Sequence, residues 1–306
     1  MELILPHQFG MVGARREHLE RLRAYGFRRV EIVVIPEEDW AWLPGYLESM
    51  VHGFSFHTPA LRDESYPENP LKAAVVDPDP ERRRRSLEMM RRELDRAAEW
   101  GARYVVAHLE RNLLMVDEPA PAGWGEQEGL ALAVEAVGEL LEYSRQVGVP
   151  VHLENLVGSP LFYSPEAYRA LAEALPEVRY CLDIGHAALN GRWFGFPERA
   201  LAEAMGPNLA SLHVYDNHLP PAVDFSTLRE SGLLRKYPVH PDHQGQPTWI
   251  DTQGCLEAAL RARPDVLVTF EVYFRLDEDP AHTAAGIEWT VEYCSRMVAE
   301  RLLNGC

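Results

Sequence analysis

The chain is poor in the residues that mark several classes of protein. Its 306 residues include only four cysteines, none in a CxxC pair, so we expect neither a disulfide framework nor a cysteine zinc site. No apolar run approaches the roughly 18 residues that a membrane span needs. The N-terminus lacks the basic and apolar regions of a signal peptide. No Gly-rich loop suited to a nucleotide cofactor is present. We therefore expect a cytoplasmic protein with no membrane segment and no nucleotide cofactor.

Positive charge is also scarce. Lysine and arginine total 30 against 47 acidic residues, which gives a formal net charge of -17, and only Lys72 and Lys236 are lysines. Nucleic-acid binding requires a basic surface for phosphate contacts, so the balance disfavours a nucleic-acid partner. It does not exclude one, because a metal cluster can supply local positive charge inside an acidic shell.

Apolar segments and helical patterns alternate along the whole chain, and 46% of the residues are hydrophobic. We predict strands near 2–5, 28–35, 51–57, 103–109, 149–154, 178–183, 209–214 and 265–272. Helices are predicted near 15–25, 37–48, 80–100, 125–147, 164–175, 196–205, 252–262 and 280–303. Eight such pairs predict a single (β/α)8 TIM barrel over residues 1–306, with its active site at the C-terminal face of the strands. Two long connections, about 58–79 and 215–250, would follow strands and line that face as walls or lids.

Side chains that can bind metal ions stand at the ends of six of the apolar runs. They are His57, His108, Glu154, Asp183, His213 and Glu271. In a barrel, the carboxyl ends of parallel strands open on one mouth, so these side chains are expected to converge there. The pattern predicts one metal-type site rather than six unrelated polar residues.

The order of these motifs resembles the xylose isomerase-like, or endonuclease IV-like, TIM-barrel superfamily. GFRRVEIVV resembles the second strand of that group, and HLEN, CLDIGHA and FEVY resemble its later metal-bearing strand ends. The resemblance covers nearly the whole chain. It implies a core metal ion bound by Glu154, Asp183, His213 and Glu271. Three carboxylates and one imidazole suit Mn²⁺, Zn²⁺, Mg²⁺ or Co²⁺, so the ligand types do not select the metal.

Other residues at the mouth would decide how many metal ions bind, from one to three. The resemblance gives His57 and His108 two roles, as ligands of a second ion or as polar contacts to substrate. His186, three residues after Asp183, would contact substrate in the isomerase branch and bind a further ion in the endonuclease branch. His240, Asp242 and His243 stand where endonuclease IV has an Asp-x-His pattern, in a different order. They are candidates for a third site or for a solvent-facing turn.

Three remaining polar positions have weaker predictions. Glu31 would hold an arginine or orient His57. His152, two residues before Glu154, would be a buried, hydrogen-bonded core histidine. The isomerase branch often carries an arginine after its seventh strand, for which Arg229 and Arg235 are candidates.

The same frame supports two reactions. The first is isomerisation or epimerisation of a sugar or sugar phosphate through an enediolate, with Glu154 and Glu271 as the proton-transfer pair and His186 orienting a hydroxyl. The second is metal-dependent hydrolysis of a phosphodiester, either abasic DNA or a small molecule such as a cobamide. A non-catalytic sugar-binding barrel is the third alternative. We favour the isomerase or epimerase, acting on a small molecule, and such barrels commonly form homodimers.

Overall fold

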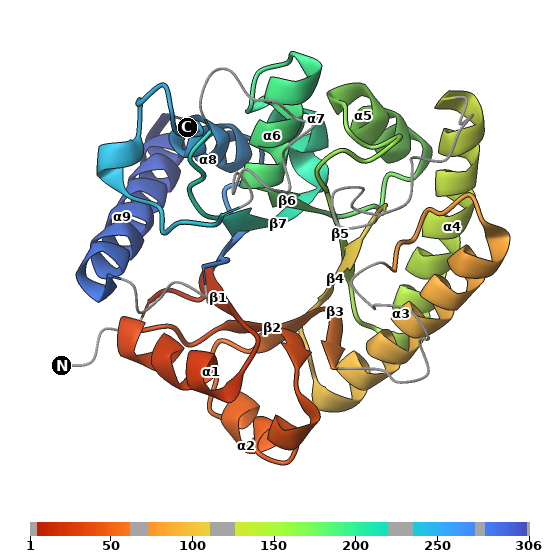
Figure 1. The fold of residues 1–306 in the computed structure, drawn as a ribbon, viewed down its shortest axis with the longest axis horizontal. Coiled ribbons are helices and arrows are strands. Elements are labelled where there is room, and N and C mark those ends of the chain that lie inside the picture. The colour runs from red at the N-terminus through yellow and green to blue at the C-terminus, as the bar shows by residue number, and fades with distance from the viewer. Residues whose placement is uncertain (1–4, 62–72, 111–125, 220–234, 273–278, 305–306) are drawn as a thin grey trace.

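A computed structural model describes residues 5–61, 73–110, 126–219, 235–272 and 279–304. Eight parallel strands form a closed barrel in chain order, with helices around the outside (Figure 1). The strands are β1 (Phe9–Gly13), β2 (Val30–Ile35), β3 (Phe54–Leu61), β4 (Val105–His108), β5 (Val151–Glu154), β6 (Tyr180–Asp183), β7 (Leu209–Val214) and β8 (Leu267–Phe270). The predicted TIM barrel is confirmed.

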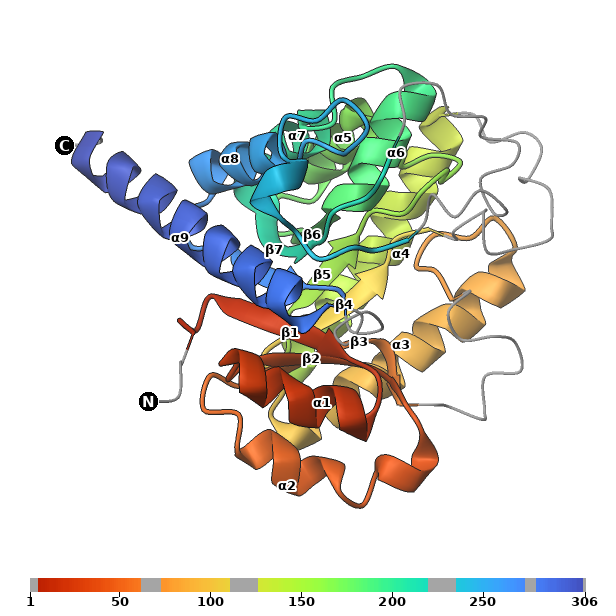
Figure 2. The ribbon, with the colours of Figure 1, turned by 60° about the vertical axis from the view of Figure 1, so that its left-hand side comes forward.

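The α-helices of the described residues form the outer ring. They are α1 (Arg16–Leu22), α2 (Leu43–Glu48), α3 (Pro80–Trp100), α4 (Glu126–Val147), α5 (Pro165–Ala174), α6 (Ile184–Phe194), α7 (Ala200–Met205), α8 (Thr252–Ala262) and α9 (Pro280–Asn304). The last of these, α9, extends away from the barrel towards the C-terminus (Figure 2). Within the described parts of the chain, no helix has both the length and the apolar character of a membrane span.

The first strand that the structure describes was not predicted. Residues 2–4 of the strand predicted near 2–5 lie outside the described residues, whereas β1 begins at Phe9 and pairs with β2 and β8 to close the sheet. Two glycines make the FGMVG segment look like a poor strand. Gly10 has a specific reason: a Cβ there would lie 2.6 Å from the guanidinium carbon of Arg29. Absence of a side chain at this position lets Arg29 enter the barrel.

Arg29 fills the barrel interior and has no solvent exposure. Its guanidinium donates to the carbonyl of Gln8, the carbonyl of Val268, the hydroxyl of Thr269 and the hydroxyl of Tyr104, at 2.8–3.1 Å. A buried arginine is tolerated when most of its N–H groups have acceptors; here the two terminal nitrogens have them and Nε has no hydrogen-bond partner among the described residues. Through these bonds Arg29, directly before β2, links the residues directly before β1 and β4 to β8.

Helix α6 was missed by the sequence analysis, which predicted a helix only from residue 196. It begins immediately after β6, and the carboxylate of Asp183 caps it by accepting a hydrogen bond from the His186 amide at 2.8 Å. Gly185 lowers helical propensity here. Its lack of a side chain is required, because a Cβ would lie 2.3 Å from a ring carbon of Tyr215.

The first long connection begins later than predicted, whereas the second follows directly after β7, which ends at Val214. Strand β3 continues to Leu61, so the first connection starts later than residue 58, and residues 62–72 lie outside the described residues. In the second, Asp216 pairs with Tyr237 and His218 with Trp249 as antiparallel bridges. Residues 235–250 therefore fold back onto the end of β7, while 220–234 lie outside the described residues.

Candidate metal centre

The C-terminal ends of β5 to β8 bring four potential ligands together. These are Glu154, Asp183, His213 and Glu271, and each offers one ligand atom within 4.8 Å of those of the other three. The strand register accounts for part of this, because Asp183 and His213 are paired across β6 and β7. The first three are almost completely buried, and the Glu271 side chain is slightly exposed at the mouth.

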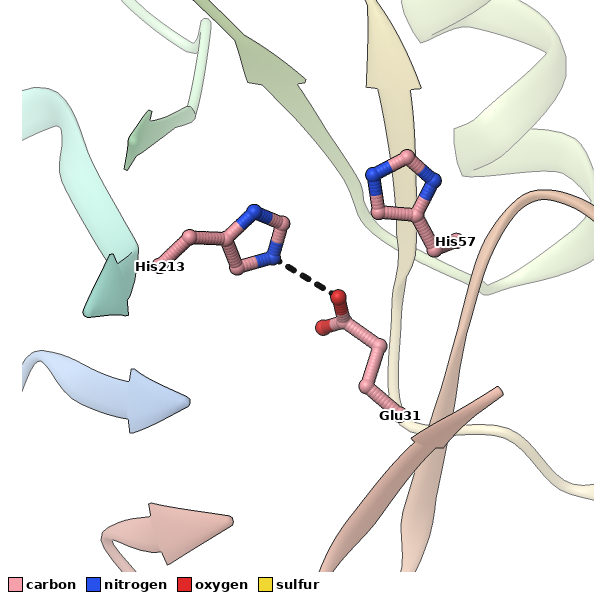
Figure 3. A group of neighbouring side chains, drawn as sticks. All are labelled: Glu31, His57 and His213. Carbon is pink, nitrogen blue, oxygen red and sulfur yellow. Dashed lines mark hydrogen bonds and ion pairs between the residues drawn. The ribbon is translucent and has the colours of Figure 1, made fainter. Parts of the chain in front are cut away.

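The imidazole of His213 is held from both sides by carboxylates. Its Nδ1 lies 3.1 Å from Glu154 Oε1 and 3.4 Å from Glu271 Oε2. Its Nε2 lies 2.7 Å from Glu31 Oε1, and the dashed line in Figure 3 marks this contact. A carboxylate partner on one ring nitrogen fixes the proton there and leaves the other nitrogen available as a ligand. Nδ1 is the nitrogen that faces the other three members of the group.

One of the two predictions for Glu31 was that it would hold an arginine, but no arginine of the described residues is hydrogen-bonded to it directly. Besides His213, it accepts hydrogen bonds on Oε2 from Ser55 at 3.2 Å and Tyr104 at 3.1 Å. Tyr104 in turn accepts from Arg29. Burial opposes ionisation of Glu31, but His213 outweighs it and lowers the pKa to about 2. Glu31 is thus a fixed anion behind His213.

Glu154 also belongs to a second donor group. Its Oε2 lies 3.0 Å from His57 Nε2 and 3.4 Å from His108 Nε2, and these three residues form another cluster with metal-ligand spacing. Burial would raise the pKa of Glu154, but His213 and His57 lower it well below its usual range. One carboxylate therefore presents Oε1 to the first group and Oε2 to the second.

Asp183 is held by its backbone as well as its side chain. The Asn155 side chain accepts from the Asp183 amide at 2.8 Å and donates to its carbonyl at 3.0 Å. Asp183 Oδ1 accepts from the His186 amide and from the Tyr215 hydroxyl, the latter at 2.7 Å. Oδ2 takes neither of these bonds. The sequence analysis missed Asn155 and Tyr215, although each closely follows a motif residue.

His186 and His152 have different surroundings. His186 Nδ1 lies 3.0 Å from the Asn155 carbonyl, to which it can only donate, so Nε2 is left as an acceptor. His152 is buried, with Nδ1 3.0 Å from Ser211 and its ring stacked on Tyr104. Burial lowers the pKa of His152 to about 3. The prediction of a hydrogen-bonded core histidine at 152 is confirmed.

The segment containing His240, Asp242 and His243 joins none of the three donor groups of the described residues, the third of which is Glu31, His57 and His213. His243 Nδ1 lies 2.7 Å from Asp216 Oδ2, and its ring stacks on Trp249 at 3.6 Å between centroids. The His240 ring stacks on His282 at 3.8 Å. Asp242 is exposed. The two histidines are engaged with side chains outside the group around Glu154.

The main residue that sequence reasoning missed is Lys236. Its Nζ lies 2.5 Å from Glu271 Oε2 and 3.4 Å from Asp183 Oδ2. The candidates named from sequence were arginines, of which Arg235 is exposed and Arg229 lies outside the described residues. Lys236, the residue after Arg235, reaches the mouth because Tyr237 pairs with Asp216 just beyond the end of β7. The one sequence feature that could have pointed to Lys236 is the rarity of lysine, since the chain has only two.

These features define a TIM barrel with buried His/Glu clusters suited to divalent metal ions. The chain belongs to the xylose isomerase-like TIM barrel family, whose model matches residues 19–293. The superfamily predicted from the motif order is therefore confirmed. No curated protein matches the sequence significantly.

Solved structures similar to this one include sugar epimerases. A D-tagatose 3-epimerase-like protein has a TM-score of 0.65 and 17% identity, covering 96% of this chain and 99% of its own. The IOLI protein with a bound zinc atom has a TM-score of 0.64 and 18% identity, covering 94% and 98%. A Thermus thermophilus protein, TTHB071, soaked with ZnCl2, has a TM-score of 0.54 and 25% identity, covering 98% and 99%.

Proposed function

We propose that the protein is a divalent-metal-dependent isomerase or epimerase acting on a sugar or sugar phosphate. The observation that carries this proposal is the convergence of three carboxylates and one imidazole on a single point at the barrel mouth. The sugar epimerases among the similar structures support the choice of substrate class. At these identities the likeness itself establishes only the fold, so the reaction rests on the site.

The donor set fits a divalent ion. Glu154, Asp183, His213 and Glu271 would hold it, because carboxylate oxygens and an imidazole nitrogen suit Mn²⁺, Zn²⁺, Mg²⁺ or Co²⁺. Its chemical contribution would be positive charge that stabilises an enediolate. The bond from His213 Nε2 to Glu31 supports this assignment, since it orients Nδ1 towards the other three donors.

The chain's own residues supply the proton transfers. Glu154 lies at the end of β5 and Glu271 directly after β8, and their carboxylates lie 3.1 Å and 3.4 Å from His213 Nδ1. One carboxylate would take the proton from the carbon next to the substrate carbonyl, and the other would return a proton to the opposite face of the same carbon, which inverts it. His186 Nε2, left as an acceptor, would orient a substrate hydroxyl.

The test is proton exchange in D₂O. Protein purified without chelator is analysed for metal and incubated with a panel of aldoses, ketoses and their phosphates, and deuterium uptake at carbon is followed by NMR. We expect uptake and a new epimer or isomer with at least one substrate. Glu154→Gln should abolish uptake, and Glu37→Gln, at an exposed site, should not. A protein that holds no metal, and whose thermal stability does not respond to metal, would instead support a non-catalytic sugar-binding barrel.

One observation favours a second candidate, a phosphodiesterase with more than one metal ion. Glu154 presents Oε2 to His57 and His108 while Oε1 faces the other group, which is the arrangement of a bridging ligand. Two ions per chain, a fall to one in His57→Ala, and turnover of bis(p-nitrophenyl) phosphate would establish this candidate. One ion per chain, unchanged in His57→Ala, would favour the isomerase or epimerase.

A further inference from the structure

The side-chain ammonium of Lys236 lies inside the candidate metal centre, between two of its carboxylates. It is 2.5 Å from Glu271 Oε2 and 3.4 Å from Asp183 Oδ2, and its side chain is 14% exposed. It also lies 4.5 Å from the centre of the Tyr215 ring, within the range of a cation–π contact. Three contacts hold a normally flexible side chain in one place.

The oxygens that Lys236 contacts are the ones that face the centre. Asp183 Oδ1 already accepts from the His186 amide and Tyr215, so Oδ2 is the oxygen left for a cation. Glu271 Oε2 is the oxygen that lies 3.4 Å from His213 Nδ1. A metal ion bound by all four residues would need the positions that the ammonium now holds, and two cations cannot share them at full strength.

The residue type also suits this role. Buried carboxylates without a counter-ion are strongly destabilising. Without Lys236 or a metal ion, Asp183 Oδ2 would keep only His186 Nδ1, at 3.5 Å, and Glu271 Oε2 only His213 Nδ1, at 3.4 Å, as basic partners among the described residues. Lysine is a compact charge on a flexible stem, whereas arginine forms a rigid fork. The chain uses lysine at only two of its 30 basic positions, and one of them is here.

We propose that Lys236 is a built-in counter-ion that neutralises Asp183 and Glu271 in the metal-free protein and is displaced when a divalent ion binds. The inference rests on the proposed metal site and adds a loading step to it. Lys236 is therefore a positioning residue. Before a metal ion binds, it keeps Asp183 and Glu271 aligned and the fold intact, and for the same reason it weakens metal binding.

The first test measures metal affinity by calorimetry, with Mn²⁺ alone added to chelator-treated full-length protein. Lys236→Met should bind Mn²⁺ more tightly than the wild type, by roughly tenfold to a hundredfold, because the competing cation is gone. Its metal-free form should melt at a lower temperature than the wild type. Arg235→Met is the matched control, since it removes the adjacent, exposed positive charge and should change affinity little. Weaker binding by Lys236→Met would overturn the proposal.

The second test needs no variant at Lys236, in case the substitution prevents folding. An amine-reactive acylating reagent is applied to the wild type with and without Mn²⁺, and labelling at the two lysines is quantified by peptide mass spectrometry. Labelling of Lys236 relative to Lys72 should rise several-fold when Mn²⁺ binds. An unchanged ratio in protein that has bound Mn²⁺ would refute displacement.

The outcomes separate this inference from the proposed function. If neither the wild type nor the variants bind Mn²⁺ or Zn²⁺, the metal site itself is refuted, and the enzyme proposal with it. If metal binds but Lys236 neither competes nor becomes reactive, only the role of Lys236 is refuted.

Discussion

Among the single side chains at the barrel mouth, Glu271 has the most proposed roles. It contacts His213 and Lys236, and it is a proposed metal ligand and proton carrier. Glu271→Gln should lower turnover by about 100-fold or more under either enzymatic candidate, because the substitution removes a charge and a base. Far-UV circular dichroism should be unchanged. Undiminished turnover would refute the shared site.

Glu31 is not one of the four proposed metal ligands but contacts one of them, His213. Glu31→Gln should keep a hydrogen-bond acceptor for His213 but lose the charge that fixes its tautomer. Partners of this kind typically contribute roughly 10- to 100-fold to metal affinity, so we expect Kd for Mn²⁺ to rise by that factor. The exposed Glu37→Gln is the control. Equal affinities in the two variants would show that Glu31 does not support His213.

Glu110 gives the fold a pH dependence of its own. Burial raises its pKa from 4.5 to about 7, although amide donors at Phe162 and Leu161 oppose this. Between these values the folded protein retains a proton that the unfolded chain releases, so the free energy of unfolding falls as pH rises from about 4.5 to 7 and then levels off.

Glu110→Gln cannot titrate and provides the comparison. Urea denaturation at several pH values should show that the wild type loses, relative to this variant, up to about 3 kcal/mol across that window. Parallel pH profiles for the two proteins would mean that the pKa of Glu110 is not raised.

The strand-end residues were predictable, and Lys236 was not, for a physical reason. Side chains such as Asp183 and His213 lie on regular strands whose register fixes their neighbours. Lys236 follows a long connection without periodicity, and its ion pairs depend on the path of that connection. The direct partner of Glu31 was likewise not predictable, because it comes from the distant strand β7.

Among the elements, the junction of β6 and α6 is the most constrained. Gly185→Ala would place a methyl group 2.3–2.5 Å from Tyr215 and push that ring, whose hydroxyl binds Asp183. We expect a loss of about 1–3 kcal/mol in the free energy of unfolding and weaker metal binding.

Gly138→Ala is a matched control in another helix, because a Cβ at Gly138 meets nothing within 4 Å. That variant should gain up to about 1 kcal/mol from improved helical propensity. Chemical denaturation of both variants tests the contrast. If Gly185→Ala also proved stabilising, the close packing against Tyr215 would be wrong.

Helices with clear periodicity and caps were predicted closely, and the exceptions have local causes. The ranges 80–100 and 252–262 coincide with α3 and α8. Asp79 caps the first by accepting from two amides, and Asp251 caps the second. The two elements that were not predicted, β1 and α6, both contain a glycine that makes room for a large side chain, Arg29 in one case and Tyr215 in the other. Sequence patterns penalise such glycines because the side chain that needs the space is far away in the chain.

For the whole molecule, the alternation of elements was sufficient to predict a closed barrel, because eight repeats of strand and helix leave no edge strand.

The stability of the barrel should depend on bound metal. At a concentration of Mn²⁺ about 100 times the Kd, binding should add about 2.7 kcal/mol and raise the melting temperature by roughly 4 °C. Calorimetry with chelator, and after Mn²⁺ is restored, tests this. Glu271→Gln should show a smaller gain, and identical melting in both conditions would contradict a structural contribution from metal.

Arg29 links the folding of the molecule to the order of its synthesis. Its partners at Val268 and Thr269 lie about 240 residues further along the chain. During synthesis, the guanidinium can therefore form its hydrogen bonds to Val268 and Thr269 only after most of the chain has been made. A chain that ends before β8 would leave this cation incompletely bonded in an open sheet, where water must solvate it. Barrel closure and completion of these hydrogen bonds of Arg29 are then one late event in folding, because both depend on contacts between residues far apart in the chain.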